Sequence, residues 1–195
     1  MDAVLFSEII LMIEVLVHFV YQNYHLKTKG ITVNCLTKGE KSEWVKLVEF
    51  WTKMSSSLCP LVLAISFFYH SFDLYTPNTF CQIFFLCILI FGVLFWNLAI
   101  LTMNTNWRAG IDTTARTKLV TSGVYSYSRN PAFFGLFVQY ISLALLNPNP
   151  LLLGFTVLSV VVLDLQTKEE EKHLTLSLGA EYTVYKDTTP RYILL

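Results

Sequence analysis

Charged residues are scarce in this sequence, and neither sign is in excess. Of its 195 residues, 14% are charged and 54% are hydrophobic, whereas globular proteins average about 25% charged residues. The 14 Lys and Arg residues balance the 14 Asp and Glu residues, so the sequence lacks the basic excess expected of a protein that binds nucleic acid. High hydrophobicity without net charge also excludes an intrinsically disordered chain.

The sequence also lacks the common motifs for metal, redox, nucleotide and hydrolytic chemistry. Its four cysteines form no Cys-x-x-Cys pair and no His/Cys spacing typical of a zinc site. Three of them lie in apolar runs, as small buried hydrophobic residues do. No glycine-rich phosphate-binding fingerprint, Ser-His-Asp order or His-Glu-x-x-His motif occurs. We therefore expect no metal ion, no disulfide framework and no nucleic acid as a partner.

Long apolar runs predict a polytopic integral membrane protein. Residues 79–101 contain no charged residue over a length close to the roughly 20 residues that cross a bilayer core. Residues 53–72 and 3–21 are two further runs of spanning length. Residues 132–164 are interrupted by an Asn-Pro-Asn-Pro sequence at 147–150, which cannot continue a helix and predicts a hairpin of two short spans. The expected fold class is all-α, an integral membrane bundle of about five transmembrane helices.

The distribution of basic residues predicts the orientation of this bundle. All 14 Lys and Arg residues fall in residues 22–53, in residues 102–131 and in the tail after residue 164. Because cytoplasmic loops concentrate Lys and Arg, five spans place the N-terminus outside and the C-terminus in the cytoplasm. We expect a multi-pass membrane protein with its active site on the cytoplasmic side.

The first apolar run carries three ionisable residues, Glu8, Glu14 and His18. Glu14 and His18 are four residues apart and share one face of a helix. We interpret them as a structural pair that faces the bundle interior or lies near the membrane interface. The alternative is a functional acid within the membrane, in contact with a substrate head group.

The chain divides into two regions by composition. Residues 1–101 hold the first three expected transmembrane helices and a basic cytoplasmic loop, and residues 102–195 hold the helical hairpin at 132–164 and a cytoplasmic C-terminal helix. Segment 104–131 is polar, contains two glycines and is longer than a simple connector. After the last span, an amphipathic segment predicts a helix that ends at Gly179. We expect a ligand site where these two polar segments meet the helix ends.

The first of these polar segments leads into a recognisable motif. LVTSGVYSYSRNPAFFG at residues 119–135 resembles the LVxxGxYxxxRHPxYxG signature of the isoprenylcysteine carboxyl methyltransferase family and its phospholipid methyltransferase relatives. The resemblance covers about residues 104–192, nearly half of the chain, in matching order and spacing. It continues through Asn106-Trp107, the LLNP turn at 145–148, KEEE at 168–171, GAEYTVY at 179–185 and Thr189-Pro190-Arg191.

The resemblance implies an integral membrane methyltransferase that uses S-adenosylmethionine. The activity it indicates is carboxyl O-methylation of an isoprenylated cysteine or a similar lipophilic acceptor, so the partners would be that lipophilic substrate and the bilayer. Residues 102–195 would then form the catalytic, cofactor-binding region. A phospholipid or other small-lipid N-methyltransferase is the alternative. An NADPH-dependent sterol-type reductase and a non-catalytic membrane protein are further alternatives.

Transferred position by position, the resemblance implies three groups of site residues. Cofactor contacts would fall on Thr117, Lys118, Leu119, Val120, Tyr125, Asn130, Pro131, Ala132, Phe133 and Glu170. Catalytic roles would fall on Arg129, Glu170 and Glu171, and substrate binding on Gln166 and Arg191. Aromatic faces at Tyr125 and Phe133 can hold adenine or a sulfonium cation.

Two positions depart from the family pattern. Asn130 replaces the histidine of Arg-His-Pro, and Gln166 stands where the family commonly has an arginine associated with the substrate carboxylate. A neutral amide cannot pair with a carboxylate as a guanidinium does. Methyl transfer to an amine therefore remains an alternative. That reaction would need a group to accept the amine's proton, such as Glu170 or Glu171. An acceptor carboxylate is already ionised and needs none.

Overall fold

The computed structural model describes residues 3–20, 33–68, 73–113 and 118–193. Within them no β-strand forms, and one isolated bridge pairs Asn34 with Ala109. The expected all-α class is confirmed. The α-helices are α1 (Ala3–Val20), α2 (Glu43–Phe68), α3 (Thr79–Met103), α4 (Pro131–Leu146), α5 (Pro150–Leu178) and α6 (Ala180–Thr188), and the 3-10 turns η4 (Asn104–Asn106) and η5 (Gly123–Ser126) lie between α3 and α4.

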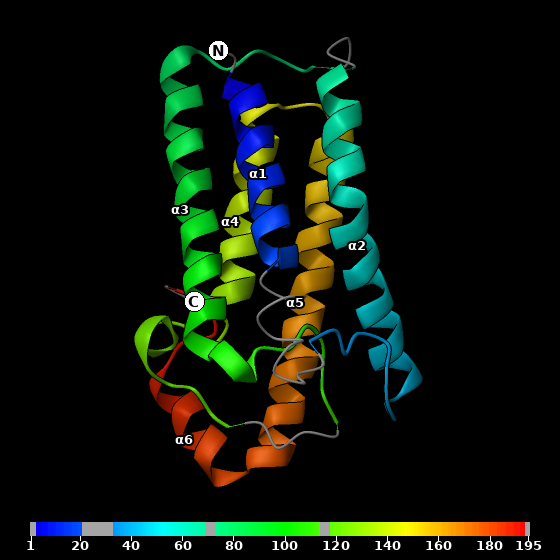
Figure 1. Ribbon diagram of the computed structural model, residues 1–195, viewed down its shortest axis with the longest axis vertical. Helices are drawn as coiled ribbons and strands as arrows, with labels where there is room; N and C mark the ends of the chain where they lie inside the picture. Colours follow the sequence, from blue (N-terminus) through cyan, green and yellow to red (C-terminus); the bar gives the residue numbers. More distant parts are fainter. Residues whose placement is uncertain (1–2, 21–32, 69–72, 114–117, 194–195) are drawn as a thin grey trace.

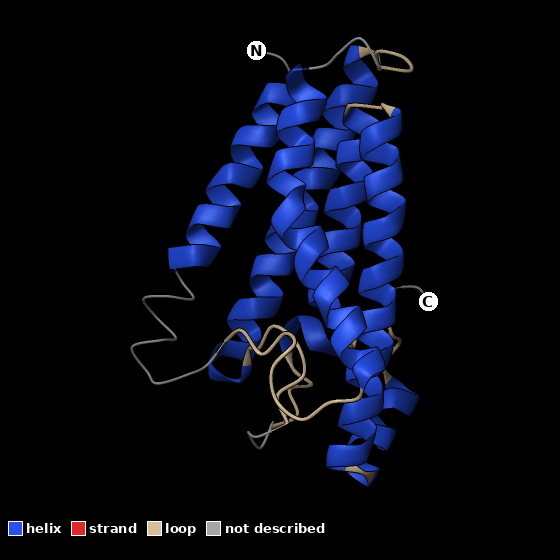
Figure 2. Cartoon of the chain, turned by 90° about the vertical axis from the view of Figure 1, so that its right-hand side faces the viewer, coloured by secondary structure: helices blue, strands red, loops and turns tan. Residues whose placement is uncertain are grey.

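Helices α1 to α5 run side by side along the long axis of the molecule (Figure 1). α3 packs mainly along α4, and α2 packs mainly along α5. The first turn of α1, residues 73–78 and the α4–α5 turn lie at one end of the bundle. α6 and the long loops gather at the other end, which we call the loop end (Figure 2). Segments that are far apart in the sequence therefore meet at the loop end.

The apolar runs of the sequence coincide with helices. Thr79–Asn106 and Pro150–Leu178 are long and apolar enough to cross a membrane, and α4 is a shorter apolar helix. α2 begins at Glu43, earlier than the expected residue 53, and its first turns mix apolar residues with the charged residues Glu43, Lys46 and Glu49. α5 continues unbroken to Leu178 instead of ending near residue 164. The five-span count and the orientation stay predictions.

Large apolar side chains cover the outside of the helices. Phe80, Phe68 and Leu158 are 78%, 76% and 67% exposed. Polar residues, most of them small, are buried beside the apolar core residues. An apolar exterior with small and polar residues at the helix contacts is typical of helices that pack together in lipid. The buried polar residues include Ser7, Ser55, Ser66, Gln139, Ser142, Thr156 and Ser159.

Side-chain hydrogen bonds join the helices and shape the α4–α5 turn. The Ser55 hydroxyl of α2 donates to the Ser159 hydroxyl of α5 at 2.8 Å. Asn147 Nδ2 donates to Ser66 Oγ at 2.7 Å, which attaches the turn to α2. Asn149 Oδ1 accepts from the backbone N–H of Leu152 at 2.9 Å and so caps α5. The Asn-Pro-Asn-Pro sequence therefore both ends α4 and starts α5.

Glu14 of α1 is buried in the bundle and accepts a 3.3 Å hydrogen bond from Gln139 Nε2 of α4. It faces the interior, as the structural interpretation of this acid predicted. The side chains of Glu8 and His18 lie outside the described residues.

α3 and α4 approach each other closely at two glycines, Gly92 and Gly135. A Cβ atom on Gly135 would lie 2.8 Å from Cβ of Trp96 and 3.0 Å from the carbonyl oxygen of Gly92. A Cβ atom on Gly92 would lie 3.0 Å from the carbonyl oxygen of Gly135. Backbone atoms cannot move aside as the tip of a flexible side chain can, so this crossing requires glycine on both helices.

Gly135→Ala should therefore destabilise the bundle, because overpacking a close helix contact typically costs about 1–3 kcal/mol. We expect a lower midpoint of thermal unfolding in detergent micelles. Gly154→Ala is the matched control, because nothing lies within 4 Å of a Cβ atom placed on that helical glycine. Equal midpoints for the two variants would contradict the proposed close contact.

Candidate functional site

The carboxylate of Glu49 holds two loops, residues 33–42 and 107–112, against α2 at the loop end. Glu49 is fully buried, and its oxygens accept from the backbone N–H of Thr37 at 2.6 Å and of Ile111 at 2.9 Å. Lys41 Nζ donates to both oxygens at 2.8 Å. The same two loops also pair through backbone bonds, because Cys35 N donates to Ala109 O at 2.9 Å. One buried ion pair thus fixes both loops against the bundle.

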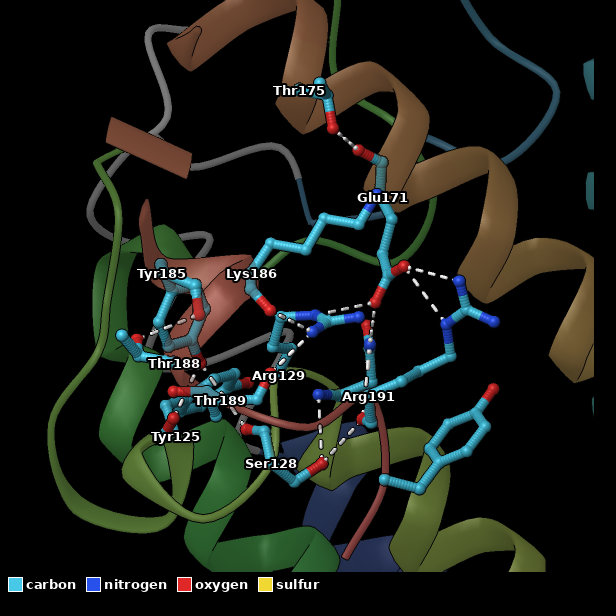
Figure 3. A network of polar contacts seen from close by, with 12 residues as sticks. Tyr125, Ser128, Arg129, Glu171, Thr175, Tyr185, Lys186, Thr188, Thr189 and Arg191 are labelled. Carbon is cyan, nitrogen blue, oxygen red and sulfur yellow. Dashed lines mark hydrogen bonds and ion pairs between the residues drawn. The ribbon is translucent and has the colours of Figure 1, made fainter. Parts of the chain in front are cut away.

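A second buried carboxylate, that of Glu171 on α5, lies between two arginines (Figure 3). Arg129 Nε donates to Oε1 at 3.1 Å, and Arg191 donates to Oε2 from Nε at 3.0 Å and from Nη2 at 2.8 Å. Asn130 Nδ2 donates to Oε1 at 2.8 Å. We call these residues, Arg129, Asn130, Glu171 and Arg191, the Glu171 cluster. It joins α5 to the segment before α4 and to the tail after α6.

Backbone hydrogen bonds reinforce the join between the tail and the segment before α4. The N–H groups of Arg129 and Asn130 donate to the carbonyl oxygens of Pro190 and Arg191 at 2.9 and 3.2 Å. The Tyr185 hydroxyl donates to the carbonyl oxygen of Tyr125 at 2.6 Å. Burial raises the pKa of Tyr185 to about 12, so the phenol remains a donor at neutral pH. The hydrogen bond to Glu171 likewise raises the pKa of Arg191.

Glu171→Gln should destabilise the loop end, because it leaves two partly buried guanidinium groups without their anion. Breaking a buried ion pair costs on the order of 3 kcal/mol. Thermal unfolding in detergent should show a clearly lower midpoint. Glu43→Gln serves as the control, because its side chain is 90% exposed in its pair with Lys46 and exposed pairs contribute little. A midpoint equal to that of the control would show that the cluster is not needed for stability.

A cavity of about 250 Å³ opens at the loop end between these two anchored parts. Its size is near the lower end of the roughly 300–1,000 Å³ typical of small-molecule sites. Trp96 of α3, Leu136 of α4 and Leu163 of α5 line its wall toward the bundle. Loop residues Arg108–Asp112 and the α6 residues Tyr182 and Tyr185 also contribute to the lining. The cavity is therefore built from both loops, the helix ends and the tail.

Most of the site residues expected from the sequence line this one cavity. Pro131, the first residue of α4, is not among the lining residues but lies in the sequence between Asn130 and Ala132, which are. Thr117 lies outside the described residues. Glu171 and Arg191 are absent from the lining and belong to the Glu171 cluster beside it. The expected residues that line the cavity are Lys118, Leu119, Val120, Tyr125, Arg129, Asn130, Ala132, Phe133, Gln166 and Glu170.

The two acids expected as proton acceptors, Glu170 and Glu171, have different surroundings. Both oxygens of Glu171 accept from cluster donors. Glu170 lines the cavity and accepts a 2.8 Å hydrogen bond from Gln166 Nε2, one turn earlier on α5. Glu170 is therefore the acid available to a ligand, and Glu171 positions the wall.

Several lining residues carry no sequence signal for a role in the site. Trp107 and Tyr185 lie in segments that carry the family resemblance, but the motif alone indicates no contact for them. Glu49 gave no signal, because its place among Glu43, Lys46 and Lys53 looks like an ordinary solvated helix start. The lining residues missed in this way include Trp107, Arg108, Asp112, His173, Tyr182 and Tyr185.

The fold and the cavity define a class: an all-helical bundle with an apolar exterior and a loop-built cavity at one end. The sequence model of the isoprenylcysteine carboxyl methyltransferase (ICMT) family matches residues 84–176. That range contains all the lining residues of segment 118–130 and of α5. The resemblance to this family is thereby confirmed.

Three curated proteins named protein-S-isoprenylcysteine O-methyltransferase are similar to this chain. The Xenopus laevis protein is 34% identical over 108 residues, which are 54% of this chain and 38% of that protein. The Dictyostelium discoideum protein is 26% identical over 172 residues, 84% of this chain and 65% of that protein. The Saccharomyces cerevisiae protein is 42% identical over 71 residues, which are 35% of this chain and 29% of that protein. The chain thus spans less than two thirds of the length of these relatives.

A solved structure, described as the eukaryotic intramembrane Ras methyltransferase ICMT, has a similar fold. The TM-score is 0.51 at 24% sequence identity, over 73% of this chain and 47% of that chain. The shared fold agrees with the helical arrangement described above.

Proposed function

We propose that this protein is an S-adenosylmethionine-dependent membrane methyltransferase that esterifies the carboxylate of an isoprenylated cysteine or a similar lipophilic acceptor. One observation carries the proposal: residues of the 119–135 motif and the α5 pair Gln166 and Glu170, far apart in the sequence, line a single cavity. The family match at residues 84–176 and the names of the similar proteins support the same activity.

The residues of the cavity suit a methyl donor that carries a positive charge. S-adenosylmethionine supplies an electrophilic methyl group on a sulfonium sulfur. Tyr125 and Phe133 offer aromatic faces to a cation, and Glu170 offers a carboxylate. Gly123 has a positive φ of 61°, which glycine adopts readily and which lets the backbone turn closely beside the cavity. We assign Lys118, Leu119, Val120, Asn130 and Ala132 to the same donor site.

A carboxylate acceptor requires no proton transfer, because a terminal carboxyl with a pKa near about 3.5 is ionised at neutral pH. The task of the protein is then to align the reactants and to exclude water. The Glu171 cluster contributes indirectly, because it fixes the backbone of Arg129 and Asn130 at the start of α4. The wall formed by Trp96, Leu136 and Leu163 suits the apolar chain of a lipid-soluble acceptor.

Labelled S-adenosylmethionine with N-acetyl-S-farnesylcysteine tests the activity, with an amine-headed phospholipid as the competing acceptor. We expect label that mild base releases as methanol, because a methyl ester is cleaved and an N-methyl group is not. Base-stable label on the phospholipid alone would replace the proposal with N-methylation. Tyr125→Ala and Glu170→Ala should weaken S-adenosylhomocysteine binding about tenfold. Tyr127→Ala, at a 69% exposed residue of the same segment, is the control and should change nothing.

We also propose five spans with the loop end in the cytoplasm. The end of the bundle opposite the loop end supports this orientation. There, residues 73–78 contact the α4–α5 turn through a 2.8 Å hydrogen bond from Leu74 N to Pro148 O. Neither segment holds Lys or Arg, as the positive-inside rule expects of outside loops. Tags near Thr76 and Asn149 should be labelled on intact cells, whereas a reporter after Leu195 should not. Labelling of the Asn149 tag only after lysis would contradict this topology.

A further inference from the structure

Two buried polar atoms of the cavity wall have no hydrogen-bond partner within the described part of the chain. They are Nε1 of Trp107 and Oε1 of Gln166. Most buried side-chain polar atoms in proteins are paired, because an unpaired one loses its hydration without compensation. Both atoms belong to the same cavity, so a ligand that fills it can supply both missing partners.

The position of the Trp107 ring is fixed by its neighbours. Its ring packs against the apolar cluster that includes Trp96, Tyr125 and Ala132. Its backbone N–H donates to Asn104 O at 3.2 Å, and its carbonyl accepts from Arg108 Nη1 at 2.8 Å. An indole N–H can only donate. The partner missing at Trp107 is therefore a hydrogen-bond acceptor.

Gln166 has the opposite requirement. Its Nε2 already donates to Glu170 Oε1 at 2.8 Å, which leaves the amide oxygen to accept. Gln166 is only 1% exposed, and its neighbour Glu170 carries a carboxylate into the same cavity. The α5 side of the cavity therefore suits a cation or a donor, while Trp107 suits an anion or an acceptor.

Three other side-chain donors of the lining have protein partners, while Lys118 is exposed and belongs to the proposed site of the methyl donor. Arg129 bonds to Glu171 and to the carbonyl oxygens of Lys186 and Thr189. Arg108 Nη1 donates to the carbonyl oxygens of Thr105 and Trp107, and its Nε lies 3.4 Å from Asp112. Asn130 Nδ2 donates to Glu171. Trp107 Nε1 remains as a buried donor for a ligand.

We infer that Trp107 Nε1 donates a hydrogen bond to the carboxylate of the methyl acceptor, an inference that rests on the proposed function. Trp107 packs against the apolar cluster to which Trp96 of α3 belongs, so this carboxylate would lie where the cavity meets the bundle that receives the apolar chain. A neutral N–H orients the carboxylate and leaves its negative charge unpaired, whereas a guanidinium would neutralise the nucleophile. The hydrogen bond would hold one carboxylate oxygen and leave the other free to react.

The step that this contact serves balances without a proton. The free carboxylate oxygen forms a bond to the methyl carbon, the bond from that carbon to sulfur breaks, and the electron pair remains on sulfur. The products are a methyl ester and a neutral thioether. Because Trp107 would touch the reacting carboxylate, it would be a catalytic residue of this reaction.

Trp107→Phe tests the assignment, because it keeps a packed ring and removes the donor. Two dissociation constants are measured without turnover: that of S-adenosylhomocysteine, and that of N-acetyl-S-farnesylcysteine in its presence. We expect acceptor binding to weaken about tenfold, about 1.4 kcal/mol, and S-adenosylhomocysteine binding to stay unchanged. The alcohol analogue, N-acetyl-S-farnesylcysteinol, should bind wild type and variant equally. Trp51→Phe, at a 53% exposed residue, is the matched control.

The outcomes separate this inference from the proposed function. Weakened S-adenosylhomocysteine binding would assign Trp107 to the donor's own carboxylate and overturn the inference. Unchanged acceptor binding would also overturn it, while the proposed function would stand. Wild-type protein that binds neither ligand would overturn both.

A second measurement uses the wild-type protein and does not depend on how the variant folds. The chain has four tryptophans, so the indole N–H resonance of Trp107 can be assigned by elimination from Phe variants of the other three. We expect a downfield shift of this resonance when the acceptor carboxylate binds and none with the alcohol analogue. No shift with the carboxylate would overturn the inference.

Discussion

The carboxylate of Glu171 is the contact on which the loop end depends. It forms ion pairs with Arg129 and Arg191 and accepts from Asn130, so a single acid joins α5, the start of α4 and the tail. A buried carboxylate is stable only when all its donors are in place, because its desolvation is offset by their combined hydrogen bonds. The cluster therefore behaves as a unit, and it positions the residues that continue from Asn130 along the cavity wall.

Glu49 has the same role on the opposite wall. It anchors residues 33–42 and 107–112 to α2 through one carboxylate and Lys41, and in this way Leu36 reaches the cavity. Thr52 and Trp96 line it too, so both expected regions of the chain, divided near residue 101, contribute to one site. In the described residues the loop end is thus organised by buried acids instead of by a sheet.

The sequence predicted the parts of the structure that depend on local patterns. Apolar runs predicted the helices, and the Asn-Pro-Asn-Pro sequence predicted the α4–α5 turn, because both effects act over neighbouring residues. The motif at 119–135 predicted the part of the cavity wall that lies before α4 and in its first turn. The partners of Glu171 and Glu49 could not be predicted, since an acid in a polar helical turn looks the same whether solvent or a distant arginine meets it. The continuation of α5 was missed because its polar second half resembles a separate amphipathic helix.

The continuous α5 has a mechanical consequence for the cavity. Its 29 residues form a rod about 43 Å long at 1.5 Å per residue, with the α4–α5 turn at one end and Gln166, Glu170 and Glu171 in the other half. A helix adapts to the thickness of its bilayer by tilting. Any tilt of this rod about the turn is transmitted to those three side chains as a lateral displacement, with no flexible joint between them and the apolar half to absorb it. The acidic wall of the cavity is therefore coupled to the lipid environment through the length of one helix.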